Sequence, residues 1–282
     1  SITNRALVCA ALADGPSTLR GALFADDTEA MVGVLRALGI DVTVDAAAAT
    51  MTVAGTSGRV PASAEEVDVR QSGTTARFAL PLLALGEGAY RVTAHPQMQA
   101  RPMAATFAAL AELGAGIEPT GTQGHLPATV RAGGRRSGTV RVPGDVSSQF
   151  LSGLLLAAPC LPDGLVIEVT TDLVSRPYVE LTIAVMEAFG ARVDQPDPRT
   201  FAVDATGYRD RVRATLEFAR KSAVAQRRIV CVALAANGLS LTIDNVTPET
   251  VAGRGTCPRA LPLPATDAAC PGPANAICAP NA

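Results

Sequence analysis

The chain has 282 residues, of which 48% are hydrophobic and 18% are charged, and its formal net charge is −2. This composition is typical of a globular protein with an ample core, arranged as one large domain or two smaller ones. The small negative charge gives no reason to expect binding to nucleic acid, and no apolar stretch approaches the roughly 20 residues that a membrane-spanning helix needs.

One pattern recurs along the chain at nearly constant spacing. In each copy, a run rich in Ala, Leu and Val is typical of a helix, ends at a glycine, and is followed by a run typical of a β-strand. These glycines are Gly15, Gly88, Gly164 and Gly238, at intervals of 73, 76 and 74 residues. Such repetition indicates one supersecondary unit copied along the chain, so equivalent residues of each copy can converge on one site.

Apolar residues at three- and four-residue spacing predict the helices, and short runs rich in Val, Ile and Thr predict the strands. Unit one, residues 1–60, has predicted helices over 4–13 and 27–38 and strands over 17–23, 41–45 and 50–54. Unit two, residues 61–135, has predicted helices over 74–85 and 102–113 and strands over 66–69, 90–94, 128–131 and near Ile117. Unit three, residues 136–205, has predicted helices over 148–158 and 177–189 and strands over 139–142, 165–170, 201–203 and near Val193. The complete unit is therefore βαβαββ.

The pattern is incomplete at both ends of the chain. Unit one lacks its first strand, so we expect a truncation there. Residues 206–246 are interpreted as a crossover and a partial fourth unit, in which 229–236 continue the helical pattern and 239–246 the strand pattern. Residues 247–282 are rich in Pro and Cys without periodicity, and we expect a disordered tail.

The first helix of each unit has an unusual beginning. The segments 1–5, 71–77 and 147–149 carry Ser, Thr, Arg or Gln and no acidic residue. Asp and Glu are the usual residues there, because a helix N-terminus has free N–H groups and partial positive charge. Hydroxyls and Arg in their place suit a bound phosphate or carboxylate. The alternative is ordinary N-capping by Ser and Thr.

Units two and three share an Arg-Pro pair before their second helix, at Arg101-Pro102 and Arg176-Pro177. Proline suits the first helical position, and the preceding arginine can hold an anion through two parallel hydrogen bonds. The alternative is an arginine that is simply solvated.

The cysteines indicate no metal centre. None forms a C-x-x-C pair or shows zinc-site spacing with His95 or His125. Cys9, Cys160 and Cys231 lie in apolar runs that are typical of buried thiols, which favours a reducing, cytoplasmic location.

Five motifs, in this order and spacing, resemble those of the 5-enolpyruvylshikimate-3-phosphate synthases (3-phosphoshikimate 1-carboxyvinyltransferases). They are S-I-T-N-R-A, S-G-T-T-A-R-F, A-R-P-M, V-S-S-Q-F-L-S-G-L-L and L-V-S-R-P-Y, within residues 1–205. The resemblance implies an α/β (α+β) fold, the enolpyruvyl transferase inverse α/β barrel. In it three βαβαββ units pack around a pseudo-threefold axis, here with an incomplete second domain, and the site lies between the two domains.

The resemblance also implies a reaction. The family transfers the enolpyruvyl group from phosphoenolpyruvate to the 5-hydroxyl of shikimate 3-phosphate, giving 5-enolpyruvylshikimate 3-phosphate and phosphate. It passes through a tetrahedral adduct and uses neither metal nor organic cofactor. Two polyanions meeting in one cleft would explain why acids are excluded from the helix starts. A monomer is expected.

Matching motif positions assign the site residues. Shikimate 3-phosphate would be held by Ser1 and Arg5, with Ser147, Ser148, Gln149, Ser175 and Tyr178 around its phosphate and ring hydroxyls. Phosphoenolpyruvate would be held by Gly73 and Arg101, and Gln149 would bridge both ligands.

The chain also departs from the family pattern. The family lysine directly precedes the position of Ser1, and the family aspartate and glutamate belong to the second half of the other domain, so no catalytic residue can be assigned here. Gln71 stands where the family usually has Asn, and Arg-Lys-Ser near residue 220 replaces Asp-Ala-Ser. We therefore expect a partial, inactive form.

Three alternatives stay open. One is a non-catalytic fragment that only binds shikimate 3-phosphate. Another is the UDP-N-acetylglucosamine enolpyruvyl transferase, although that enzyme has a reactive Cys in the loop where residues 95–100 of this chain have none. RNA 3′-phosphate cyclase shares the unit more distantly, and the absence of a basic stripe disfavours it.

Overall fold

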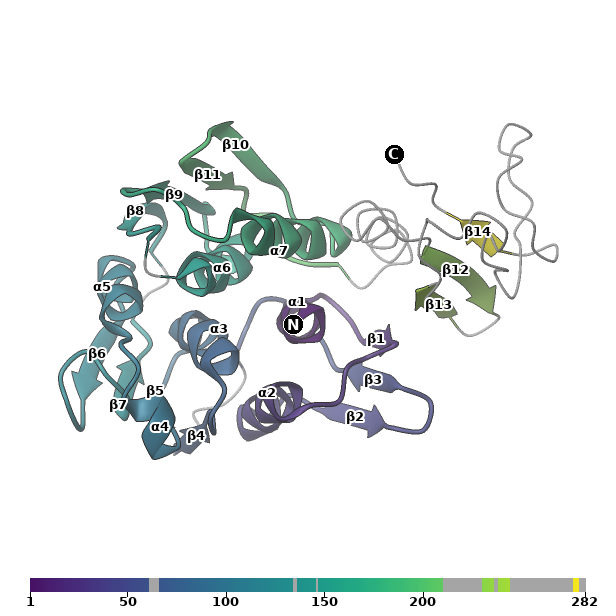
Figure 1. Ribbon diagram of the computed structural model, residues 1–282, viewed down its shortest axis with the longest axis horizontal. Helices are drawn as coiled ribbons and strands as arrows, with labels where there is room; N and C mark the ends of the chain where they lie inside the picture. The colour runs from purple at the N-terminus through teal and green to yellow at the C-terminus, as the bar shows by residue number, and fades with distance from the viewer. Residues whose placement is uncertain are drawn as a thin grey trace.

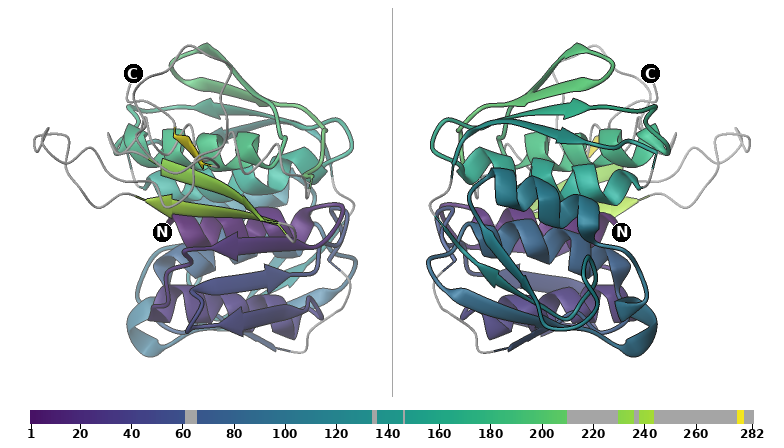
Figure 2. Two further views of the ribbon diagram at one scale, coloured as in Figure 1. Left: turned by 90° about the vertical axis from the view of Figure 1, so that its right-hand side faces the viewer. Right: turned by 90° about the vertical axis from the view of Figure 1, so that its left-hand side faces the viewer.

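The computed structural model describes residues 1–60, 66–133, 136–145 and 147–209, together with the backbone of three strands within 230–278. Helices fill the centre of the three-unit body formed by residues 1–209, and three sheets surround them (Figure 1). The helices and the strands that cover them run in nearly the same direction (Figure 2). Each unit therefore contributes one outer sheet and a share of a common helical centre.

Unit one is a small sheet with two helices packed beneath it. The elements are α1 (Ile2–Leu12), β1 (Ser17–Arg20), α2 (Asp26–Ala37), β2 (Val42–Asp45) and β3 (Thr50–Val53). The strand order is β1-β3-β2 and both pairings are antiparallel. Val42, Met51 and Val53 face inward, because alternate side chains of a strand lie on opposite faces of the sheet.

Unit two adds a first strand that pairs in parallel. Its elements are β4 (Glu66–Asp68), α3 (Gly73–Ala84), β5 (Ala89–Thr93), α4 (Pro96–Gln99), α5 (Ala104–Glu112), β6 (Gly116–Pro119) and β7 (Ala128–Arg131). The strand order is β4-β5-β7-β6, and β4 runs parallel to β5.

Unit three has the same topology. Its elements are β8 (Gly138–Val142), α6 (Ser148–Ala157), a short 3₁₀ turn η1 (Ala158–Cys160), β9 (Leu165–Val169), α7 (Arg176–Ala188), β10 (Val193–Asp197) and β11 (Thr200–Val203). The strand order is β8-β9-β11-β10, with β8 parallel to β9. Equivalent strands thus occupy equivalent places in units two and three, and unit one follows the same order without the first strand.

The first helices of the three units, α1, α3 and α6, contact one another at the centre. Almost every residue of these helices is buried, as expected of helices that are apolar on all sides. Gly153 lets α6 approach α3 closely, because a Cβ at this position would collide with the carbonyl oxygen of Arg77. The arrangement confirms the predicted packing of three units around a pseudo-threefold axis.

The predicted helix over 102–113 is wrong at its start. A separate short helix, α4, is capped by the His95 side chain, and α5 begins only at Ala104, after Met103. The backbone N–H of Met103 donates to the carbonyl oxygen of Gly124 at 2.8 Å, which turns the chain between the two helices. Pro102 therefore precedes the helix and is not its first residue.

The predicted helical run over 229–236 is also wrong. Val230–Ala235 form a strand, β12, which pairs antiparallel with β13 (Gly238–Ile243). A short apolar run with β-branched residues fits a buried strand as well as a buried helix, and the Asn-Gly pair at 237–238 is a hairpin signal that favours the strand. Within the expected disordered tail, Ala276–Cys278 form β14 and pair with β12; the rest of 247–282 lies outside the described residues.

The three-unit body extends beyond residue 205. Tyr208 is buried, and its hydroxyl donates to the carbonyl oxygen of Leu156 at 2.8 Å. Its backbone forms a parallel bridge with Ala13. The beginning of the predicted crossover therefore packs against α1 and α6; its remainder, up to residue 229, is outside the described part of the chain. No helix among the described residues has the length and apolar character needed to cross a membrane.

Candidate functional site

The beginnings of five helices are tied together by side-chain hydrogen bonds. The carbonyl oxygen of Asp27, in α2, accepts from the Asn4 amide of α1 at 3.2 Å and from the Thr75 hydroxyl of α3 at 2.9 Å. Gln149 of α6 contacts α3 as well, through Thr74 and Arg77. Arg5 of α1 reaches the first turns of α7. The predicted site residues at these helix starts are thereby brought to one end of the helical centre.

Serine caps each of the three central helices. The hydroxyls of Ser1, Ser72 and Ser147 accept from the backbone N–H groups of Asn4, Thr75 and Gln149 at 3.2, 3.0 and 3.3 Å. None of these helices has an acidic residue in its first turn. Ordinary N-capping thus explains the serines, and the missing acids still leave the helix starts electropositive. Ser148, the first residue of α6, is buried.

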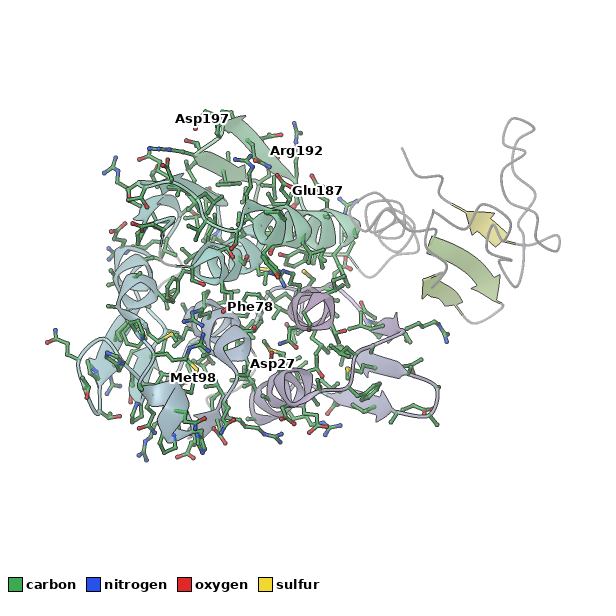
Figure 3. All side chains as sticks on the ribbon, viewed as in Figure 1. Asp27, Phe78, Met98, Glu187, Arg192 and Asp197 are labelled. Atoms are coloured by element: carbon green, nitrogen blue, oxygen red, sulfur yellow. The ribbon has the colours of Figure 1, made fainter. Side chains whose placement is uncertain are left out.

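Arg5 is a buried cation at the start of α1. Its Nε donates to the Thr182 hydroxyl at 2.7 Å, and its terminal nitrogens donate to the carbonyl oxygens of Ser1 and Tyr178 at 3.0 and 3.3 Å. Its guanidinium lies 5.3 Å from the ring centroid of Phe78, which sits on the side of α3 facing α1 (Figure 3). Burial lowers the pKa of Arg5 to about 10. The guanidinium stays protonated at neutral pH, and its acceptors are all uncharged.

Arg77 is a second buried cation, on α3. One terminal nitrogen donates to the carbonyl oxygen of Gly73 at 3.2 Å and to the side-chain oxygen of Gln149 at 3.0 Å. The guanidinium lies 4.8 Å from the ring centroid of Phe150. Burial, and the charge of nearby Arg101, lower the pKa of Arg77 to about 10. Because the guanidinium groups of Arg77 and Arg101 carry the same charge and lie near each other, an anion bound between or beside them would be stabilised.

Gly73 is where the two arginines meet. A Cβ at this position would collide with a terminal nitrogen of Arg101 and lie 2.7 Å from one of Arg77. Across the described ranges, neither arginine forms an ion pair with a carboxylate. The N-terminus of α3, two guanidinium groups and a residue without a side chain therefore lie together in an arrangement that would suit an anion. The side chain of the neighbouring Gln71 is directed to His95, with its Nε2 3.1 Å from the His95 Nδ1.

The second Arg-Pro pair behaves differently from the first. Arg176 contacts the Glu180 carboxylate at 3.1 Å, the Gln195 side-chain oxygen at 3.0 Å and the carbonyl oxygen of Pro198 at 3.1 Å. Its guanidinium is thus engaged by α7 and by the β10–β11 hairpin of its own unit. These contacts disfavour Arg176 as an anion holder, and the role of Arg101 stays a prediction.

Ser175 and Tyr178 lie at the start of α7, beside Arg5. Ser175 has a left-handed backbone, with φ 57° and ψ 42° and no side-chain capping bond. This conformation is strained for a residue with a Cβ, and such residues concentrate at binding sites. The Tyr178 side chain is 58% exposed, which is unusual for a large aromatic residue and leaves it available to a ligand.

The structure also shows site residues that the sequence did not single out. Arg77 lay inside a quoted motif, four residues after Gly73, as Arg5 follows Ser1 by four, and this spacing could have identified it. Thr182 carries no comparable signal, because its contact with Arg5 joins residues that are 177 positions apart. No group of acidic, His or Cys side chains that could hold a metal ion occurs among the residues described.

The EPSP synthase (3-phosphoshikimate 1-carboxyvinyltransferase) family model matches residues 1–257. The 3-phosphoshikimate 1-carboxyvinyltransferase of Trichormus variabilis is 40% identical over 205 residues, which are 73% of this chain and 48% of that protein. That of Bordetella pertussis is 40% identical over 208 residues, 72% of this chain and 47% of that protein. The chain thus spans about half the length of these curated relatives.

Solved structures agree on the fold. The EPSP synthase of Acinetobacter baumannii superposes with a TM-score of 0.63 at 23% identity, covering 72% of this chain and 45% of that one. The repeated topology, the acid-free helix starts and these similarities lead to one conclusion: the chain belongs to the EPSP synthase (3-phosphoshikimate 1-carboxyvinyltransferase) family.

Proposed function

We propose that this chain binds shikimate 3-phosphate and phosphoenolpyruvate, and that it contributes these binding groups to the transfer of the enolpyruvyl group to the 5-hydroxyl of shikimate 3-phosphate. One observation carries the proposal. Arg77 and Arg101 approach each other at Gly73, at a helix N-terminus, with no carboxylate paired to either among the described residues. A doubly charged phosphate group is the ligand that relieves this repulsion best.

The site residues divide between the two ligands. Gly73 and Arg101 bind phosphoenolpyruvate, and Gln149, in the first turn of α6, contacts α3 and would bridge both ligands. Arg5 supports the shikimate 3-phosphate side, together with the hydroxyl and ring groups of Ser1, Ser147, Ser148, Ser175 and Tyr178. This division is what the family resemblance implies, and two separate buried arginines, one contacting α7 and the other α6, are consistent with it.

These groups bind charge but do not move protons. General acid–base catalysis needs a titratable group within hydrogen-bond reach of the reacting atoms. In the stretches that the structure describes, Arg77 and Arg101 have only uncharged hydrogen-bond partners, namely backbone, amide and sulfur atoms. We therefore propose binding without turnover for the described part, with the proton-transfer groups supplied from outside it.

Calorimetric titration tests the proposal. Shikimate 3-phosphate and phosphoenolpyruvate are titrated into the chain separately, with shikimate, which lacks the phosphate, as the matched control. We expect both phosphorylated ligands to bind and shikimate to give no heat at the same concentration. Equal heats for shikimate and its 3-phosphate would contradict the phosphate-binding role of these helix starts. Phosphate release from the two ligands together, followed in the same samples, would instead show that the chain is catalytically complete.

A cytoplasmic monomer is part of the same proposal. The three repeated units pack on one another within one chain through their helices. Cys9 is a fully buried thiol, and burial raises its pKa far above the ordinary value, which suits a reducing compartment. Light scattering during size-exclusion chromatography measures the mass, and a value of twice 28.8 kDa would contradict the monomer.

A further inference from the structure

The contact between Arg77 and Gln149 fixes the orientation of the Gln149 side-chain amide. Arg77 donates to the side-chain oxygen of Gln149 at 3.0 Å, and the side-chain nitrogen of Gln149 is 3.1 Å from the Thr74 hydroxyl. A guanidinium has only donors, so the amide oxygen must turn toward it. The Thr74 hydroxyl can donate or accept and would tolerate either orientation. Among the described residues, Arg77 is therefore the partner that fixes the amide.

Arg77 is itself held in place from several sides. Arg77 is buried, with only 5% of the residue exposed. The carbonyl oxygen of Gly73 accepts from it, and its guanidinium stacks over Phe150, which is the neighbour of Gln149 in α6. The close approach of α6 at Gly153 brings these residues together. A side chain constrained in this way can orient a neighbour precisely.

We propose that Arg77 is a positioning residue, which holds the Gln149 amide so that its N–H group, and not its oxygen, is presented to the phosphorylated ligands. An amide nitrogen carries two N–H groups, and one is directed to Thr74. The second is the donor that an anion can accept from. The reversed amide would place an oxygen lone pair against the anion and lose the bond. The inference rests on the proposed function for its ligand, but the contact itself is independent of any ligand.

The first experiment needs no ligand. The side-chain amide resonances of Gln149 are assigned in the ¹⁵N-labelled full chain as the pair that disappears in Gln149→Leu. We expect these protons to exchange with water about tenfold faster or more in Arg77→Met than in the unaltered chain, because the amide loses a hydrogen bond to a charged group. The matched control is Arg131→Met, which removes an exposed arginine paired with Glu118 on the outer sheet. An unchanged exchange rate of the Gln149 amide protons in Arg77→Met would overturn the proposal.

The second experiment separates positioning from direct contact. Phosphoenolpyruvate affinity is measured by calorimetry for Arg77→Met, Gln149→Ala and the double variant. If Arg77 acts through Gln149 in addition to its own charge, Arg77→Met weakens binding about tenfold more in the unaltered chain than in the Gln149→Ala background. Equal losses in both backgrounds would mean that Arg77 acts independently of Gln149, and would overturn the proposal.

The two experiments keep the inference apart from the proposed function. If phosphoenolpyruvate does not bind the unaltered chain at all, the proposed function fails, while the resonance experiment still decides whether Arg77 orients Gln149. If the ligand binds and the double variant shows additive losses, the function stands and the positioning role is rejected.

Discussion

Replacing Gly73 by alanine should weaken ligand binding while leaving the free energy of unfolding nearly unchanged. The glycine is the first residue of α3, and its φ is not in the left-handed region, so the backbone accepts alanine. The added methyl would collide with terminal nitrogens of Arg101 and Arg77. Arg101 is exposed, and the end of its side chain can move away without disturbing the backbone, whereas the constrained Arg77 needs only a small shift. The substitution should therefore lower the affinity for the ligand and leave the free energy of unfolding nearly unchanged.

The magnitudes differ enough to be told apart. Glycine within a helix costs roughly 0.5–1 kcal/mol relative to alanine. The free energy of unfolding of Gly73→Ala should therefore lie within about 1 kcal/mol of that of the unaltered chain. A hydrogen bond to a charged group contributes about 1.5–3 kcal/mol, so displacing the arginines should weaken phosphoenolpyruvate binding roughly ten- to hundredfold.

Gly33→Ala is the matched control. Gly33 lies within α2, and a Cβ there would meet nothing within 4 Å. This variant should gain about 0.5–1 kcal/mol in stability and bind phosphoenolpyruvate unchanged. Urea unfolding and calorimetric titration measure the two quantities for each variant. The reasoning is refuted if Gly73→Ala binds phosphoenolpyruvate as tightly as Gly33→Ala, or if it loses several kcal/mol of stability while its affinity is kept.

Four further predictions concern Arg101 and three other contacts or backbone positions of the three-unit body. Arg101→Ala should weaken phosphoenolpyruvate binding at least about tenfold more than shikimate 3-phosphate binding, since its guanidinium lies beside Gly73; calorimetry showing equal losses would contradict the division of ligands. Thr182→Val removes the acceptor of a buried cation, Arg5, and should lower the free energy of unfolding by about 2 kcal/mol; a loss under 0.5 kcal/mol in urea melts would count against a stabilising role. Tyr208→Phe removes one buried hydrogen bond and should cost about 1 kcal/mol in the same assay, whereas no change would separate this residue from the three-unit body. Ser175→Gly relieves a left-handed backbone and should raise the melting temperature, by an amount equivalent to about 1 kcal/mol; a lower melting temperature would mean that the serine hydroxyl holds this turn.

Local sequence patterns predicted most of the elements. The helical and strand runs of units one and three lie within a few residues of their observed bounds, because apolar periodicity and β-branched runs report the environment of a segment directly. The same reasoning failed where local signals were balanced. The run 230–235 is apolar and short, so its own composition fits a helix or a strand, and the following Asn-Gly pair together with pairing to β13 makes it a strand.

The candidate site shows the same division. Acid-free helix starts are visible in the sequence, because capping and charge at a helix terminus involve residues within one turn. Which arginine faces the site is not visible. Arg101 and Arg176 both precede a proline. They differ because oxygen atoms of the β10–β11 hairpin accept hydrogen bonds from Arg176, and this contact comes from the folding of unit three.

What the sequence by itself determined is the repeating unit and the electropositive beginnings of its central helices, since both depend on residues close together along the chain. Only the tertiary structure decided how those beginnings are joined. The contact of Arg77 with Gln149 spans 72 positions, and that of Arg5 with Thr182 spans 177. Such contacts depend on how α3 meets α6 and how α1 meets α7, and that packing arises from the whole buried core and not from any single segment.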